Sequence, residues 1–205
     1  MLAILVILIT FGIALAHIPE GYAPVKRQVA ETVGSHSMRK ARHVYDWCEN
    51  QVTGEFDHKL KITANKHITW DPNGWCKLKT VMIVESSGNP NAISPAGAQS
   101  LFQLMPPTFS RFAKCRNVFD PECNIDTGIR HLAYLNKFWY FDRTQDCRDH
   151  LVWASSNWGE GNVLREQSNQ HDARCITEQW NLPRETRHHL ARITRYLELR
   201  NLEAL

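Results

Sequence analysis

Apolar residues recur at helical spacing along most of this chain, and that period is its strongest constraint on the fold. The apolar stripes lie in residues 36–53, 78–85, 125–140 and 190–197. Side chains three and four positions apart share one face of an α-helix, so each stripe predicts a helix with that face buried. No segment shows sustained strand alternation, although a short β-hairpin would fit between Asp57 and Trp70. The sequence therefore predicts a mainly α fold.

Glu85 occupies the same helical stripe as Leu78, Val81 and Met82. Its carboxyl group is therefore expected to face the core or a cleft. Loss of hydration there disfavours the charged form and raises the pKa toward the value that a general acid needs. The alternative is an ordinary helix-terminal glutamate that turns out to solvent.

Turn-forming residues follow Glu85 at once. Residues 88–97 contain two glycines and two prolines, which fold the chain back and bring the apolar run 101–105 near the acid. Within that run, the amide of Gln103 is both a donor and an acceptor, which suits the hydroxyl and acetamido groups of a sugar. A buried structural glutamine is the alternative. The sequence predicts one carboxylic acid in an apolar wall beside a polar groove.

Four ordered blocks of the chain share residues with one known family. They are Glu85-Ser86 with Ser94–Ala98 and Leu101–Thr108, then Phe119–Gly128, then Ala154–Val163, and last Leu182–Arg187. Together they resemble the motifs of the soluble lytic transglycosylase family, and four blocks in order are far more specific than one short motif. The resemblance implies a lysozyme-like catalytic domain over residues 71–200. Residues 17–70 would be a lead-in and an N-terminal helical segment that packs on the core.

The resemblance also implies a reaction, cleavage of the β-1,4 bond between N-acetylmuramic acid and N-acetylglucosamine in peptidoglycan. Glu85 would be the catalytic residue, and with one family-type carboxylate it would act twice, whereas most glycosidases divide the work between two. In this hypothesis Glu85 protonates the glycosidic oxygen, the acetamido group of the substrate stabilises the cationic centre, and Glu85 then takes the proton of the C6 hydroxyl. The product is a 1,6-anhydromuramoyl end, and no water is consumed.

The substrate-binding residues that the resemblance implies are Ser86, Phe102, Gln103, Asn157 and Trp158. Ser86 would orient the Glu85 carboxyl or the acetamido group, while Gln103 and Asn157 hold the sugar. Each has a structural alternative: the Ser86 hydroxyl satisfies the end of its own helix, Asn157 is a turn residue, and Trp158 packs in the core.

Four positions depart from the family pattern. Ser100 stands in place of a glycine, Ser156 in place of the tyrosine of the Tyr-Asn-Ala-Gly motif, Trp158 in place of a small alanine, and His189 in place of a closing tyrosine. The motif tyrosine normally lies near the catalytic acid in this family. The departures therefore bear on how the acid is tuned and how the intermediate is stabilised.

Two other functions stay open. A goose-type muramidase that hydrolyses the same bond with water would share the fold and Glu85, and a non-catalytic wall-binding or scaffold protein would share the groove. Asp120 and Asp126 are the other candidates for a second acid. Their neighbours favour a turn residue and a first-turn helix acid instead.

The charge of the chain is mild. The net charge is +3 over 205 residues, and the basic residues are scattered. Nucleic-acid binding needs a concentrated basic face, which the sequence lacks, whereas a slightly basic surface suits the carboxylates of peptidoglycan. A hydrophobic content of 43% is enough to bury a core. The sequence predicts glycan strands as the partner, without nucleic acid, cofactor or metal.

Residues 1–16, MLAILVILITFGIALA, are uncharged and end in Ala14-Leu15-Ala16, which fits the cleavage pattern of a secretory signal. A positively charged start is missing, and the apolar run is just short of a spanning helix, so an uncleaved membrane anchor is the alternative. The sequence predicts an exported protein of the periplasm or cell envelope, or one carried on a virion. A wall-remodelling, secretion, conjugation or phage apparatus would each use such an enzyme.

Six cysteines in an exported chain predict up to three disulfides. The proposed pairs are Cys115–Cys123, Cys48–Cys76 and Cys147–Cys175. Zinc is the competing interpretation, but no Cys-x-x-Cys or His-x-x-x-His spacing supports it. The adjacent His188 and His189 are expected on the last helix as a solvated pair.

Overall fold

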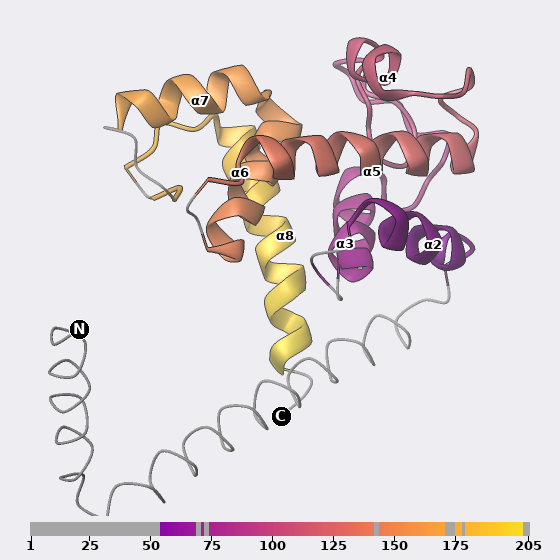
Figure 1. The fold of residues 1–205 in the computed structure, drawn as a ribbon, viewed down its shortest axis with the longest axis horizontal. Coiled ribbons are helices and arrows are strands. Elements are labelled where there is room, and N and C mark those ends of the chain that lie inside the picture. Colours follow the sequence, from indigo (N-terminus) through magenta and orange to yellow (C-terminus); the bar gives the residue numbers. More distant parts are fainter. Residues whose placement is uncertain are drawn as a thin grey trace, which may run out of the picture. The chain divides into compact units, whose positions relative to one another are not determined.

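The computed structural model describes residues 54–68, 71, 74–141, 144–170, 175–177 and 179–202, with side chains in the last helix up to Glu198. Within this part of the chain there are seven α-helices, and strand pairing is limited to two isolated bridges (Figure 1). The prediction of a mainly α fold is confirmed. The expected leader of residues 1–16, the lead-in from residue 17 and the expected helix over residues 36–53 lie outside the described residues.

The helices are α2 (Asp57–His67), α3 (Gly74–Ser86), α4 (Pro106–Phe112), α5 (Pro121–Phe138), α6 (Gln145–Trp158), α7 (Glu160–Asn169) and α8 (Arg184–Leu202). None of them is both long enough and apolar enough to cross a membrane, as far as the described residues go.

Helix α5 is the central element and packs against α2, α4 and α6. Its buried stripe of Ile125, Ile129, Leu132 and Leu135 repeats every three or four residues, as the sequence predicted. The helix begins earlier than expected because Asp120 caps it, accepting a hydrogen bond of 2.7 Å from the backbone N–H of Cys123. A side-chain cap of this kind satisfies an N–H that has no partner within the helix.

Helix α2 corrects the suggestion of a hairpin between Asp57 and Trp70. Its buried residues Leu60, Thr63 and Ala64 follow helical spacing, and this face packs against α3 and α5. The buried Lys79 of α3 holds the first turn of α2 through an ion pair of 2.7 Å with Asp57. The segment is largely polar, so its apolar period is short and weak, and packing decides its structure.

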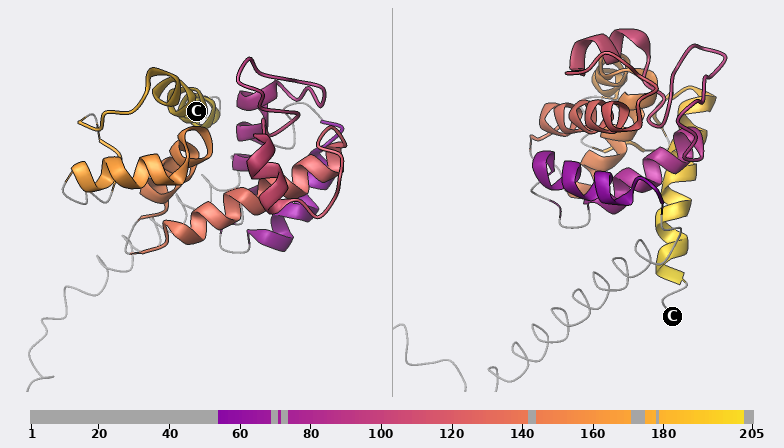
Figure 2. Two further views of the ribbon diagram at one scale, coloured as in Figure 1. Left: turned by 90° about the horizontal axis from the view of Figure 1, so that it is seen from above. Right: turned by 90° about the vertical axis from the view of Figure 1, so that its right-hand side faces the viewer.

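Helices α3 and α8 pack against each other, and α8 also packs against α6 (Figure 2). Leu78, Val81 and Met82 of α3 are buried, which confirms the predicted stripe. A sharp corner at Gly159 ends α6 and starts α7, and its φ of +91° is one that residues with a side chain rarely adopt. One turn before the corner, α6 is joined to the end of α5, because the indole N–H of Trp139 donates to the Ser155 hydroxyl at 2.9 Å.

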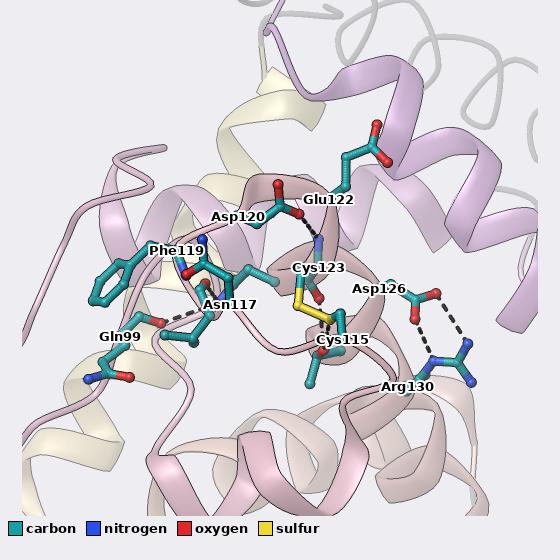
Figure 3. The surroundings of a disulfide bond; sticks show 12 residues. Gln99, Cys115, Asn117, Phe119, Asp120, Glu122, Cys123, Asp126 and Arg130 are labelled. Atoms are coloured by element: carbon teal, nitrogen blue, oxygen red, sulfur yellow. Dashed lines mark hydrogen bonds and ion pairs between the residues drawn. A yellow bond between two sulfur atoms is a disulfide. The ribbon is translucent and has the colours of Figure 1, made fainter.

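Two of the three predicted disulfides are confirmed. Cys115 is bonded to Cys123 at the start of α5 (Figure 3), and Cys147 at the start of α6 is bonded to Cys175. Cys76 is disulfide-bonded as well, while its proposed partner Cys48 lies outside the described residues.

Candidate active site

A cleft of about 700 Å³ opens between α3 and α8, and Glu85 lies in its wall. Four segments line the cleft, one of which is the return loop, residues 87–105 between α3 and α4. The lining residues are Val84 and Glu85 from α3, Ser94, Ala96, Ala98, Gln103 and Met105 from the return loop, Ser156 and Asn157 from α6, and Arg184, Glu185, His188, His189 and Arg192 from α8. A smaller cavity of about 30 Å³ adjoins it and shares Glu85, Gln103, Met105 and Ser156. Segments far apart in sequence thus meet around one carboxyl group.

Glu85 sits in the last turn of α3, and its side chain is only 17% exposed. Burial raises the pKa of this carboxyl to about 7; the charge of Glu185 adds to the rise, and that of Arg192 opposes it. The carboxyl end of a helix carries partial negative charge, which also disfavours a carboxylate there. The group can therefore carry a proton near neutral pH and release it within the same range, as a general acid must.

The return loop has a defined backbone. Ser87 and Gly88 take left-handed conformations with φ of 55° and 76°, which turn the chain straight after α3. Gln99 exchanges backbone hydrogen bonds with Leu104 at 2.9 and 3.0 Å. The buried amide of Asn124 on α5 accepts from the backbone N–H of Phe102 at 2.8 Å. These contacts hold the loop against α5, beside Glu85.

Gln103 lines both the cleft and the smaller cavity, as its predicted role requires. Its amide nitrogen donates to the carbonyl oxygens of Ser100 at 2.8 Å and Ala92 at 3.2 Å. The side chain is therefore braced by the loop that carries it, and the amide oxygen is the atom it can offer to a ligand.

Ser100 stands where the family pattern has glycine, and its backbone has a conformation that favours glycine. Its φ is +66°, the left-handed region that favours glycine, and its side chain is fully buried. Among the described residues its hydroxyl finds no hydrogen-bond partner. The loop therefore has a glycine-like backbone conformation at a position that is occupied by serine.

Asn157 and Ser156 form the part of the wall contributed by α6. The side-chain oxygen of Asn157 accepts a hydrogen bond of 2.8 Å from the hydroxyl of Thr186, which joins the end of α6 to the start of α8. Ser156 donates to the carbonyl oxygen of Trp153 at 2.9 Å and borders both cavities. A serine is much smaller than a tyrosine, so it leaves open space beside Glu85.

Three other expected site residues lie away from the main cleft. The Ser86 hydroxyl donates to the carbonyl oxygen of Met82 and accepts from the backbone N–H of Gly88, each at 3.2 Å, so it is engaged at the end of its own helix. Phe102 borders only the smaller cavity and is buried against Gly128. Trp158 packs against the hydrophobic core and borders neither cavity.

His189 was expected to be solvated, and that expectation is wrong. Its side chain is 6% exposed, and its Nε2 lies 3.7 Å from Oε1 of Glu85. Burial, aided by the positive charge of Arg192, lowers the pKa of His189 to about 4. His188 is exposed, as expected. Helix α8 packs one face against α3, and a one-residue step along a helix rotates a side chain by about 100°. His189 therefore lies on the buried face and His188 on the exposed one.

The charged rim of the cleft was not predicted from the sequence. Arg184, His188 and Arg192 are spaced by four residues along α8, so they share the face that lines the cleft. Glu185 and His189 are spaced in the same way. This period was available in the sequence, but nothing local showed which face of α8 would meet the cleft.

Asp120 and Asp126 have structural roles. Asp120 caps α5, and Asp126 pairs with Arg130 at 2.6 Å (Figure 3). Asp126 also lies 3.5 Å from His67. Asp126 lies in the second turn of α5 and not the first, because the helix begins at Pro121. Among the described residues, no three His, Cys, Asp or Glu side chains are placed to hold a metal ion.

Residues 68–177 match the family described as the transglycosylase SLT domain. Membrane-bound lytic murein transglycosylase C from Shigella sonnei is 38% identical over 101 residues, which are 43% of this chain and 28% of that protein. The protein of the same name from Cronobacter sakazakii is 36% identical over 103 residues, covering 45% of this chain and 29% of its own length. The chain thus spans less than a third of these relatives.

Two solved structures share the fold. The 70 kDa soluble lytic transglycosylase SLT70 from Escherichia coli superposes with a TM-score of 0.57 over 74% of this chain and 25% of its own, at 22% identity. An inactive mutant of the lytic transglycosylase Slt from Pseudomonas aeruginosa gives a TM-score of 0.53 over 78% of this chain and 27% of its own, at 18% identity. The predicted lysozyme-like transglycosylase fold is confirmed.

Proposed function

The chain belongs to the transglycosylase SLT domain family, and from that membership we propose that it is a lytic transglycosylase that cleaves the glycan strands of peptidoglycan. The curated relatives are named lytic murein transglycosylases, which supports this substrate. One observation carries the proposal: the half-buried carboxyl of Glu85 lies in the wall of a large cleft, and its pKa is raised to about 7.

In the proposed reaction Glu85 begins protonated. It donates its proton to the glycosidic oxygen as the bond from that oxygen to C1 of N-acetylmuramic acid breaks, and the acetamido group of the same sugar stabilises the positive charge at C1. The Glu85 carboxylate then takes the proton of the C6 hydroxyl while the C6 oxygen bonds to C1. The product is a 1,6-anhydromuramoyl end, and Glu85 is protonated again without the use of water.

Gln103 and Asn157 are the proposed sugar-binding residues. Both line the cleft, and each has one end of its amide held by the protein, the nitrogen of Gln103 and the oxygen of Asn157. The other ends, an acceptor and a donor, would meet the hydroxyl or acetamido groups of the substrate. Phe102 lines the smaller cavity together with Gln103. The contacts of Ser86 and Trp158 favour their structural alternatives over direct contact with the sugar.

We place the protein in the cell envelope, because peptidoglycan lies there and the curated relatives are named membrane-bound. Residues 1–16 would direct export and would then be removed or serve as an anchor. The protein would open the wall locally for remodelling, secretion, conjugation or phage passage. Fractionation of cells that make the full chain and a chain without residues 1–16 tests this; recovery of both forms in the cytosol would contradict it.

Hydrolysis of the same bond is the second candidate, and Glu185 is the observation that favours it. This exposed carboxyl lines the same cleft as Glu85, and a muramidase can use a second carboxylate to activate water. A Glu185→Gln variant distinguishes the two, because it would abolish hydrolysis but leave the Glu85-dependent transfer to the C6 hydroxyl in place.

Mass spectrometry of fragments released from purified peptidoglycan tests the proposed function, with the chain lacking residues 1–16 and its Glu85→Gln variant as the control. Anhydromuramoyl ends that disappear in the variant would support the transglycosylase. Reducing ends would transfer the assignment to the hydrolase. A folded protein that binds the wall and releases nothing would be a scaffold.

A further inference from the structure

The buried nitrogen that faces the proposed catalytic acid has no hydrogen-bond partner in the described part of the chain. Nε2 of His189 is shielded from solvent and makes no hydrogen bond with any described residue, although it lies 3.7 Å from Oε1 of Glu85. The Glu85 carboxyl likewise accepts no hydrogen bond within the described part of the chain. A buried polar atom without a partner costs free energy, so a contact made at another stage of the reaction is a natural reason for this arrangement.

The proposed reaction supplies such a stage. Once Glu85 has given its proton to the glycosidic oxygen, a carboxylate remains in a wall that is poorly hydrated, and burial disfavours this charged form. A donor that can approach by less than 1 Å would bring the contact within hydrogen-bond range, about 2.7–3.2 Å for N–H and O. His189 is in that position.

We propose that neutral His189, with its proton on Nε2, is a positioning residue that donates a hydrogen bond to Oε1 of Glu85 while Glu85 is ionised. This inference rests on the proposed function. The proposal also gives a role to His189 as the replacement of the closing tyrosine of the family pattern, since an imidazole N–H and a phenol O–H can both donate to a carboxylate.

The charges around the pair favour a hydrogen bond from a neutral imidazole over an ion pair. Burial and the nearby Arg192 both oppose a charge on His189. The other titratable groups that face Glu85 are Arg184, Glu185, His188 and Arg192 from α8 and His131 from α5. The return loop and the end of α6 face it with uncharged residues. His131 is itself buried, and its lowered pKa of about 4 leaves it neutral in the range where Glu85 titrates.

The pH dependence of peptidoglycan cleavage tests the inference. In the wild type, kcat/KM should fall as pH rises through about 7, because Glu85 must be protonated to start the reaction. His189→Leu removes the donor that stabilises the carboxylate, so the Glu85 pKa should rise and this alkaline limb should move up by about one pH unit. For the same variant, kcat on the acidic plateau of the pH profile should fall about tenfold, because the stage of the reaction in which Glu85 is ionised loses the same stabilisation. KM should stay close to the wild-type value.

Two further variants separate donation from packing. His189→Tyr restores a donor and should return the alkaline limb toward its wild-type position, which a purely structural role would not require. His58→Leu makes the same chemical change at an exposed residue of α2 and should leave the profile in place. An unmoved limb in a folded His189→Leu protein, judged by its circular dichroism and thermal melting, would overturn the inference.

A measurement on the unmodified chain keeps the test independent of both turnover and mutant folding. In ¹⁵N NMR of the wild type, His189 should be the tautomer with its proton on Nε2, and its chemical shift should change as Glu85 titrates. A proton on Nδ1 would overturn the inference even if the enzyme cleaves peptidoglycan. A wild type that shows the expected titration but releases no fragments would instead contradict the proposed function.

Discussion

Replacing Ser100 with glycine should stabilise the protein, although this serine lies in the loop beside the proposed catalytic acid. Its φ of +66° costs a residue with a side chain about 1–2 kcal/mol. Its buried hydroxyl has no partner among the described residues, which costs about 1–3 kcal/mol. The backbone contacts of Ser100, an N–H to the carbonyl of Ala92 at 2.7 Å and a carbonyl to the N–H of Gln103 at 3.1 Å, do not need the side chain.

Two losses oppose these gains. Glycine gives up about 0.5–1 kcal/mol in chain entropy on folding, and the substitution removes one buried carbon, worth about 0.8 kcal/mol. With mid-range values for the two gains, Ser100→Gly should stabilise the fold by about 2 kcal/mol. For a domain of this size, that corresponds to a rise in Tm of about 5 °C.

Urea unfolding of Ser100→Gly, Ser100→Ala and Ser87→Gly separates the contributions. Ser87 has nearly the same backbone conformation, φ 55°, but is exposed, so glycine there relieves only the backbone and should gain about 0.5 kcal/mol. Ser100→Ala keeps the unfavourable φ and removes the hydroxyl, so it should gain about 1–2 kcal/mol. A Ser100→Gly protein no more stable than the wild type, beside a Ser87→Gly protein that behaves as expected, would refute the reasoning.

Glu85→Gln should stabilise the fold increasingly as pH rises from 4.5 to about 7, because the folded wild type holds the Glu85 proton more tightly than the unfolded chain does, and the gain should level off near 3 kcal/mol. Urea unfolding of the variant and the wild type at pH 4 and pH 8 would measure this gain. Gly128→Ala should cost about 1–3 kcal/mol, because an added Cβ would lie 2.5 Å from Cγ of Phe102; a thermal melt unchanged from the wild type would contradict this close approach. Replacing both Cys147 and Cys175 with serine should lower the unfolding free energy by about 3.5 kcal/mol, the chain-entropy value for a loop of 28 residues. An equal unfolding free energy with and without the disulfide would show that the bond does not act through the unfolded chain.

Much of the site could be predicted from the sequence, because its signals are local. The apolar period of α3 places Glu85 on the buried side of its helix, and the glycines and prolines after it require the chain to turn back. Gln103 follows on the returning segment, and the ordered blocks around both residues point to the transglycosylase family. The two cysteine pairs observed, Cys115–Cys123 and Cys147–Cys175, were also proposed from sequence.

Other features depended on which surfaces meet. The sequence by itself determined that α8 is amphipathic, but only its packing against α3 put His189 beside Glu85 and left His188 in solvent. Likewise, α2 is too polar for its period to exclude a hairpin, and its packing on α3 and α5 decided the helix. Periodicity and turn chemistry are properties of neighbouring residues, whereas burial, and with it the pKa of a carboxyl or an imidazole, depends on atoms that the fold brings from distant parts of the chain.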